Sequence, residues 1–330
     1  MSNYKRSLEE AAAFMRAHDR YLVLSHVNPD GDATGSALAV AQMLKDLGKS
    51  FVVINEGETP EKFSFLPGSS QILNLSVSPL EEIFSAVIAV DCADRSRMGK
   101  VEHLFAPDVQ LLNIDHHPTN DGFGTLNVIR TEAAATAEIL YDLAATAEFL
   151  LQPDLALCLY TGLLTDTGGF RYSNTTPHVM ESAARLLTFG VNPGDVAERC
   201  LEVITLGHVQ VLRRALASLE LTHQKLVASV AVSRQDLAEA GANREDAGGL
   251  VNYCRNIEGV EVGISFVEAD TDVFKVSLRS RSYVNVAEVA QKLGGGGHAK
   301  AAGCTVKGPI DTVRKQVLSL VGEAIGSERG

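Results

Sequence analysis

The first half of the chain alternates short apolar runs with stretches of helical spacing. Four runs are apolar at nearly every position, namely YLVLS, FVVIN, AVIAVD and VQLLNID at residues 21–25, 51–55, 86–91 and 109–115. Such runs are typical of strands in a parallel sheet that is covered on both faces. Helical spacing predicts helices between or after them, at 37–48, about 132–150 and about 153–164. This rhythm predicts an open, doubly wound, mainly parallel α/β domain.

The pattern changes in the second half. Residues 179–222 are mostly of helical pattern, with a break at 190–194. Beyond them, strand-like runs at 225–233, 260–269 and 273–282 alternate with helical stretches at about 245–257, 286–293 and 309–325. We therefore predict a first α/β domain, a helical linker and a second, smaller α/β domain, with bounds 1–192, 193–222 and 223–330.

Composition and charge narrow the function. The net charge is −12, whereas a protein that coats duplex DNA needs a broad positive field. Trp is absent and aromatic residues make up 6% of the chain, so we expect no wide stacking platform for long single strands. A small anionic substrate held by metal ions or by a local basic cluster remains compatible with this composition. We therefore expect no duplex DNA as a partner.

The cysteines and the N-terminus indicate a compartment. Five cysteines occur without a CxxC pair, which argues against a disulfide framework and against a cysteine zinc site. Residues 1–20 are charged and of helical pattern, without the apolar core of a signal peptide. No apolar run approaches the roughly 18 residues that a membrane span needs. We therefore expect a cytoplasmic protein with buried free thiols and no membrane partner.

Acidic and histidine residues collect where the predicted strands end. The carboxyl ends of parallel strands share one edge of the sheet, so these side chains should meet. They are His26, Asp30 and Asp32, then Asp91 with Asp94 behind it, then Asp115, His116 and His117, and finally Asp166 between two helical stretches. One Asp after a strand is often only a helix N-cap or a turn residue. Three successive strands that end in Asp or His are harder to explain in that way.

The residue types indicate the metal. Crowded carboxylates repel one another, and divalent cations relieve that repulsion. Oxygen ligands with a few imidazoles and no thiolate suit manganese, magnesium or iron better than structural zinc. There are enough ligands for two ions, which together can drive phosphoryl transfer. We also expect Gly31 to place Asp30 and Asp32 in a tight turn, and Gly35 and Ser36 to open the next helix.

A glycine run marks the second domain. Gly294–Gly297 is followed by His298, and Arg279 lies upstream in SLRSR. Glycines let a backbone approach a ligand and present N–H groups to an anion, and arginine suits bidentate contact with phosphate. The alternative is a flexible loop between a helix and a strand. We favour a substrate-binding role for Arg279, Gly295, Gly296, Gly297 and His298.

At these residues the sequence resembles the DHH phosphoesterase superfamily. HVNPDGD, VDCAD, DHH and TDTGGF resemble its four ordered motifs across residues 20–175, while SLRSR and GGGGHAKAAG resemble its companion DHHA1 domain. The two-domain nanoRNase and bisphosphate-nucleotidase group is the most similar. The resemblance implies hydrolysis of short oligonucleotides such as pApA to nucleoside 5′-monophosphates, and of 3′-phosphoadenosine 5′-phosphate to AMP. It also implies two divalent metal ions, with Mn²⁺ expected.

The resemblance assigns roles to single residues. It implies that one ion is bound by His26, Asp30 and Asp91, and the other by Asp32, Asp91, His116 and Asp166. Asp91 would then bridge the two ions. It further implies that His117 contacts the scissile phosphate, and that Asp115 orients a histidine. Asp94 would lie behind the ligands.

Several alternatives stay open at this point. A metal centre on one domain and a phosphate-binding segment on the other would select substrates of two to a few nucleotides. Enzymatic alternatives are a cyclic-dinucleotide phosphodiesterase and a RecJ-like single-strand exonuclease. A nucleotide-binding regulator would require a broken metal site, whereas every expected ligand position is filled. A generic α/β metal-binding protein would leave the glycine-histidine segment unexplained. The family resemblance also leaves a homodimer open.

Overall fold

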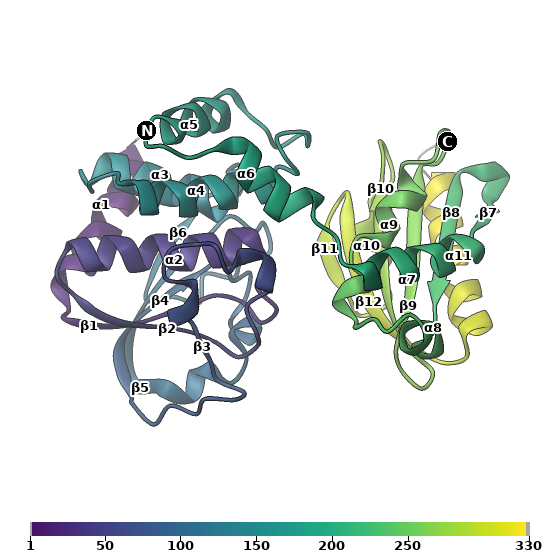
Figure 1. The fold of residues 1–330 in the computed structure, drawn as a ribbon, viewed down its shortest axis with the longest axis horizontal. Helices are drawn as coiled ribbons and strands as arrows, with labels where there is room; N and C mark the ends of the chain where they lie inside the picture. The colour runs from purple at the N-terminus through teal and green to yellow at the C-terminus, as the bar shows by residue number, and fades with distance from the viewer. Residues whose placement is uncertain (1, 328–330) are drawn as a thin grey trace. The chain divides into compact units, whose positions relative to one another are not determined.

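The computed structural model describes residues 2–327 and divides the chain into two compact units, Met1–Val203 and Ile204–Gly330 (Figure 1). The unit boundary falls inside the predicted linker. That segment contains helix α6 (Pro193–Ala197), the π-helical turn η4 (Glu198–Glu202), helix α7 (Leu206–Ala217) and strand β7 (Glu220–Thr222). Within the described residues, no helix combines the length and the apolar character needed to cross a membrane.

The first unit is built on a parallel sheet of six strands in the order β3-β2-β1-β4-β5-β6. The predicted parallel α/β fold is therefore confirmed. The sequence did not predict the short edge strands β3 and β6. The strands are β1 (Arg20–Leu24), β2 (Ser50–Asn55), β3 (Leu73–Asn74), β4 (Phe84–Val90), β5 (Phe105–Asp115) and β6 (Leu126–Ile129).

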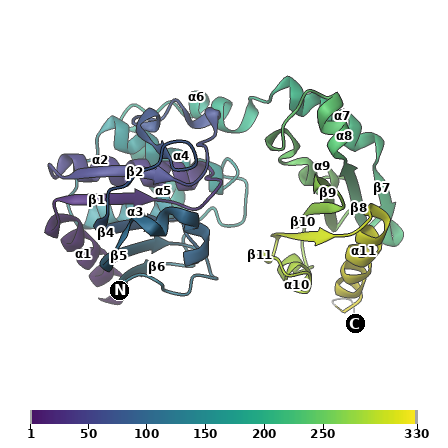
Figure 2. The same ribbon diagram turned by 90° about the horizontal axis from the view of Figure 1, so that it is seen from below.

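Both faces of this sheet are covered, which explains why its strands are apolar at almost every position. Tyr21 and Val23 of β1 pack into the core beneath the helices, while Leu22 and Leu24 belong to a second core on the opposite face. Short 3₁₀ turns, η3 (Arg95–Leu104) above all, cover that opposite face. The helices, seen from two sides in Figures 1 and 2, are α1 (Ser2–Ala17), α2 (Gly31–Asp46), α3 (Thr136–Thr146), α4 (Pro153–Asp166) and α5 (Pro177–Leu187).

Helix α2 begins earlier than expected. Its N-cap is Asp30, whose Oδ1 accepts hydrogen bonds from the backbone N–H groups of Asp32 and Ala33, both at 3.1 Å. The expected helix start at Gly35 and Ser36 is therefore wrong, because an aspartate cap extends the helix back by one turn. Gly35 instead allows close helix packing, since a Cβ there would lie 2.6 Å from the carbonyl oxygen of Cys158 in α4.

The second unit contains a mixed sheet in the order β11-β12-β10-β9-β8-β7, in which β8 and β9 pair in parallel and the other ladders are antiparallel. Its remaining strands are β8 (Val227–Val232), β9 (Val262–Asp270), β10 (Val273–Ser280), β11 (Gly296–His298) and β12 (Ala301–Lys307). Helices α7, α8 (Arg234–Glu239) and α9 (Leu250–Arg255) pack on one face. Helices α10 (Val286–Gln291) and α11 (Ile310–Ser327) pack on the other.

A buried carboxylate organises the loop between β10 and α10. Glu261 is only 4% exposed, and it accepts hydrogen bonds from the backbone N–H groups of Ser282, Tyr283 and Val284 at 2.8–3.2 Å and from the Ser282 hydroxyl at 2.6 Å. Burial raises the pKa of Glu261, but these donors lower it by more, so the pKa lies below its usual value. The ionised side chain therefore replaces water for three consecutive N–H groups.

We predict that Glu261→Gln lowers the free energy of unfolding at pH 7 by roughly 1–3 kcal/mol, since an amide offers one acceptor oxygen and turns its NH₂ toward N–H donors. The pKa of Glu261 is lower in the folded than in the unfolded chain. Its stabilisation is therefore fully present above about pH 4.3 and is lost as the pH falls through the folded pKa. Urea unfolding should show the difference between wild type and variant narrowing below that pH.

The matched control is Glu258→Gln, because Glu258 is exposed. It should stay within about 0.5 kcal/mol of wild type. A stability difference for Glu261→Gln that stayed constant from pH 7 to pH 3 would show that the carboxylate charge does not act in this way.

Candidate metal centre

The carboxyl ends of β1, β4 and β5 bring their acidic and histidine residues together at one edge of the first sheet. Two helices add further carboxylates, namely Asp30 and Asp32 at the start of α2 and Asp166 at the end of α4. Possible ligand atoms lie within 4.8 Å of one another in three groups. These groups are His26 with Asp30 and Asp91, Asp32 with His116 and Asp166, and Asp91 with His116 and His117.

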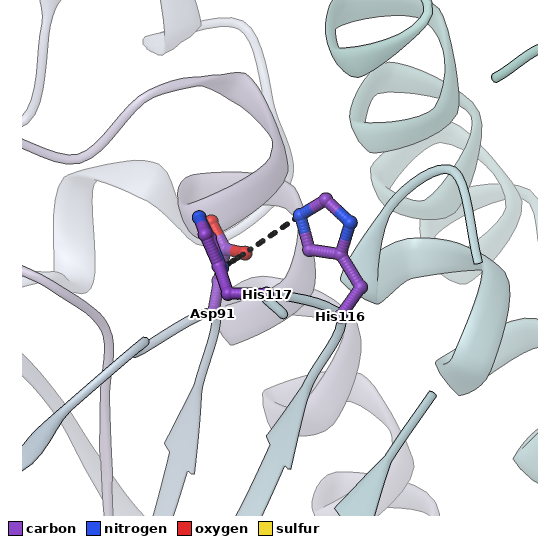
Figure 3. Close-up of side chains that lie close together, drawn as sticks. All are labelled: Asp91, His116 and His117. Carbon is purple, nitrogen blue, oxygen red and sulfur yellow. Dashed lines mark ion pairs between the residues drawn. The ribbon is translucent and has the colours of Figure 1, made fainter. Parts of the chain in front are cut away.

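Asp91 belongs to two of these groups. Its Oδ2 is 3.5 Å from Nε2 of His26. Its Oδ1 is 3.6 Å from Nε2 of His116 and also 3.6 Å from Nδ1 of His117 (Figure 3). The residue follows β4 directly in the left-handed region, at φ 57°, and its N–H donates to the carbonyl of Ile114. Such backbone conformations cluster at functional sites. The two oxygens of one carboxylate thus face two different histidines, as a carboxylate that bridges two ions would require.

The histidines present the nitrogen that a metal would need. Nδ1 of His26 lies 2.8 Å from the carbonyl oxygen of Val27, and Nδ1 of His116 lies 3.2 Å from that of Ala133. A carbonyl can only accept, so both rings carry their proton on Nδ1 and turn Nε2 toward Asp91. Histidines that bind metals usually donate their other ring N–H to such a carbonyl or carboxylate.

His117 is held differently. Its Nδ1 lies 2.8 Å from Oδ1 of Asp115, a fully buried carboxylate. Oδ2 of Asp115 accepts a 2.6 Å hydrogen bond from Asn120, whose amide also donates to the carbonyl of Cys92. Burial lowers the pKa of His117, but Asp115 and Asp91 raise it by more, so the net shift is upward. Asn120 looks like an ordinary loop residue in the sequence, and its bond to Asp115 was not predicted.

The electrostatics fit a cation-binding site. Burial and the neighbouring Asp91 and Asp30 raise the pKa of Asp32 far above its usual value, and burial together with Asp32 does the same for Asp166. Burial also raises the pKa of Asp91, but the surrounding histidines lower it below its usual value. Divalent cations would relieve this repulsion. Cys92 belongs to the core on the opposite face of the sheet, so it offers no thiolate to this site. Carboxylates and imidazoles without a thiolate are the donor set expected for manganese, magnesium or iron.

Asp94 belongs to none of these groups. Its side chain caps η3 by accepting from the N–H of Arg97 at 3.2 Å and from the hydroxyl of Ser96. The helix-cap explanation therefore holds for Asp94. Asp30 caps a helix as well, yet it also lies within reach of His26 and Asp91.

In the second unit, three neighbouring strands align two of the proposed substrate-binding residues. Arg279 of β10 pairs with Ala301 of β12, which in turn pairs with His298 of β11. Residues paired across a sheet point to the same face, and neighbouring strands lie about 4.8 Å apart. Leu278 and Ala302 point into the core beneath α10 and α11. Arg279 and His298 therefore share the opposite face.

The glycine run is ordered for reasons that the sequence did not reveal. Gly296 and Gly297 belong to β11 and pair with β12. A Cβ on Gly297 would lie 2.5 Å from the carbonyl oxygen of Ala301, and a Cβ on Gly295 would meet the backbone of Gly303 and Cys304. Close packing of two strands thus requires these two glycines. A Cβ on Gly296 would face open space.

Comparison with known families matches both units. The model of the DHH family, N-terminal domain, matches residues 20–163, and the model of the DHHA1 domain matches residues 223–326. The matched regions contain all the residues grouped above except Asp166, and they contain Arg279 and the glycine run.

The chain is also similar to whole proteins of known name. It is 35% identical over 306 residues to the bifunctional oligoribonuclease and PAP phosphatase NrnA of Thermus thermophilus, covering 92% of this chain and 89% of that protein. It is 27% identical over 292 residues to the NrnA of Bacillus subtilis, covering 88% and 90%. In fold it resembles an exopolyphosphatase-related protein from Bacteroides fragilis, with a TM-score of 0.91, 22% identity and 98% of each chain covered.

We predict that the metal-free chain binds two Mn²⁺ ions and that Asp91→Ala weakens the binding of both at least tenfold, because each oxygen of Asp91 faces a different group. Isothermal titration calorimetry measures both events. Asp94→Ala is the matched control, since it removes a helix cap outside the groups and should leave both affinities unchanged. Unaltered Mn²⁺ binding by a folded Asp91→Ala protein would refute the shared role of Asp91.

Proposed function

The chain belongs to the DHH family of phosphoesterases, and we propose that it is a two-metal hydrolase of very short nucleotides. Its substrates would be linear dinucleotides such as pApA, cleaved to nucleoside 5′-monophosphates, and 3′-phosphoadenosine 5′-phosphate, converted to AMP. Relatives named bifunctional oligoribonuclease and PAP phosphatase, which match almost the whole chain, support this proposal. The observation that carries it is the carboxylate of Asp91, whose two oxygens face His26 and His116.

The proposed ions are Mn²⁺. His26, Asp30 and Asp91 would hold one of them, and the other would be held by Asp32, Asp91, His116 and Asp166. Two bound divalent ions supply Lewis acidity, which activates a water and neutralises charge on the phosphate oxygens. In this proposal the Nδ1–H groups of His26 and His116 stay bonded to backbone carbonyls, which keeps both Nε2 atoms turned inward.

His117 would act on the substrate rather than on a metal. Its hydrogen bond to Asp115 engages Nδ1. A protonated ring turned toward the scissile phosphate would stabilise negative charge there, or donate a proton to the leaving oxygen. Asp115, itself held by Asn120, would keep the ring in that orientation.

The second unit would bind the part of the substrate that does not react. Arg279 and His298 on one face of the sheet offer a fixed cation and a further donor, and the exposed backbone at Gly296 lets a ligand approach closely. Gly295 and Gly297 would shape this segment. Selection for short substrates is part of the proposal. A reducing cytoplasm is part of the proposal, in keeping with five free, buried cysteines.

The decisive measurement is hydrolysis with and without Mn²⁺ of a panel of phosphate compounds. The panel contains pApA, cyclic di-adenylate, 3′-phosphoadenosine 5′-phosphate, a 24-mer RNA, a 24-mer DNA and pyrophosphate. We expect pApA and the bisphosphate to be preferred, and a chelator to abolish turnover. Asp91→Ala should be slower on the order of 10³-fold, which corresponds to the several kcal/mol that metal ions contribute.

Each other outcome supports a different function. A preference for the long strands would move the protein to the single-strand exonucleases, and a preference for the cyclic compound to the second-messenger phosphodiesterases. Equal rates on the 2-mer and on the 24-mers would reject length selection. Absence of turnover by protein with bound Mn²⁺ would favour a nucleotide-binding regulator.

A second prediction concerns the substrate anchor. Arg279→Ala should raise KM for pApA at least tenfold with little change in kcat, because it removes binding that is equal in the ground and transition states. Arg281→Ala is the control, since Arg281 donates to the backbone carbonyls of Arg255 and Ile257 and serves the loop. Steady-state kinetics that gave both variants the same KM would exclude Arg279 as the anchor.

A further inference from the structure

The segment that leads into α3 contacts ligand candidates from several elements. The carbonyl of Ala133 faces Nδ1 of His116 at 3.2 Å. Three residues later, the backbone N–H of Thr136 donates to Oδ2 of Asp32 at 2.6 Å, and its hydroxyl donates to Oδ1 of Asp91 at 3.0 Å. The sequence pattern predicted only a helix here, and neither the motifs nor the family resemblance assigned Thr136 a role.

Asp32 acts as the missing cap of helix α3. The N-cap residue, Ala135, makes no side-chain cap bond. The first helical N–H groups, those of Thr136 and Ala137, donate instead to the two oxygens of Asp32 at 2.6 and 3.0 Å. Helix N-termini need such acceptors and favour negative charge. The carboxylate of Asp32 is therefore oriented by a helix that lies more than a hundred residues further along the chain.

These bonds limit how Asp32 can bind a cation. Oδ1 accepts from Ala137 N–H and also from the hydroxyl of Ser36 at 3.1 Å, while Oδ2 accepts from Thr136 N–H. A carboxylate offers about four lone-pair positions, two on each oxygen. Three are used, so the remaining position lies on Oδ2. Ser36, Thr136 and Ala137 together leave Asp32 one direction in which to bind an ion, and Thr136 N–H fixes where that direction lies on Oδ2.

The hydroxyl of Thr136 has the corresponding effect on Asp91. Its hydrogen bond to Oδ1 fixes the rotation of a carboxylate whose Oδ1 faces His116 and whose Oδ2 faces His26. Both side chains are buried, at 0% exposure for Thr136 and 2% for Asp91, so water does not compete for this bond. One residue therefore orients two carboxylates that repel each other.

Hydrogen bonds and an ion pair hold the segment before α3 in place. Glu138 accepts from the N–H of Ala134 at 2.7 Å, and Arg130 pairs with Glu138 at 3.3 Å. The amide of Asn174 donates to the carbonyls of Ala134 and of Asp166, at 3.1 and 3.2 Å. The backbone before α3 is thus tied to the end of α4, where another ligand candidate lies.

We propose that Thr136 is a positioning residue of the metal centre, which holds the carboxylate of Asp91 so that its two oxygens serve two ions and fixes the direction in which Asp32 binds. The inference rests on the proposed two-metal function. An ion held by Oδ1 and His116 would depend on the Thr136 hydroxyl directly. An ion held by Oδ2 and His26 would depend on it less, because Oδ2 does not receive this bond.

The test is Mn²⁺ titration calorimetry on the metal-free full chain. Thr136→Val keeps the shape and the backbone N–H but removes the hydroxyl, and it should weaken one of the two binding events about 10–100-fold. Thr136→Ser restores the hydroxyl and should recover wild-type affinity within a few-fold. Turnover of pApA by Thr136→Val should fall at low Mn²⁺ and recover as Mn²⁺ is raised, with KM for pApA unchanged.

Thr161→Val is the matched control, because Thr161 is equally buried and its hydroxyl donates to the helix carbonyl of Leu157. It should bind both ions as wild type does. The proposal is overturned if folded Thr136→Val binds both ions with wild-type affinity, if Thr136→Ser is as weak as Thr136→Val, or if Thr161→Val shows the same loss. The titration contains no nucleotide, so its result does not depend on turnover. If the wild-type protein hydrolysed nothing in the panel, the proposed function would be rejected, and the role of Thr136 in Mn²⁺ binding could still be measured.

Discussion

The structure of the first unit depends on one electrostatic constraint, the crowding of buried carboxylates at a single edge of the sheet. Burial raises the pKa of Asp32 and of Asp166 well above the usual value, and the nearby carboxylate of Asp91 raises both pKa values further. Such an arrangement is stable only if positive charge and hydrogen-bond donors surround it. Histidines, backbone N–H groups and the first turn of α3 supply part of that compensation, and the remainder fits divalent cations.

The scaffold that produces this crowding relies on close approach of helices. Gly35 of α2 lies against the backbone of Cys158 in α4, and a Cβ on Gly162 of α4 would lie 2.6 Å from Oδ1 of Asp32. Small residues at this crossing let α2 and α4 bring Asp32 and Asp166 to the same histidine, His116. The positions of the ligand candidates and the helix packing therefore depend on the same contacts, and a bulky residue at either glycine would disturb both.

In the second unit, the sheet fixes the positions of charged side chains and of a glycine-rich strand. Its sheet aligns Arg279 with His298, and Glu261 holds the next loop by replacing water at three N–H groups. Two residues of the glycine run pack against β12, so an apparently flexible segment is part of the sheet. The strand pairing therefore gives a defined backbone to a segment whose sequence is mostly glycine.

The sequence by itself determined the parallel α/β architecture, the family and the set of candidate ligands, because apolar runs and ligand-type residues at strand ends are local features. It did not predict where α2 begins, or that the glycine run forms a strand paired with β12. It also missed Thr136 and Asn120, which look like ordinary helix and loop residues. Their importance lies in hydrogen bonds to Asp91, Asp32 and Asp115. For Thr136 those bonds join positions far apart in the chain, and only tertiary packing brings them together.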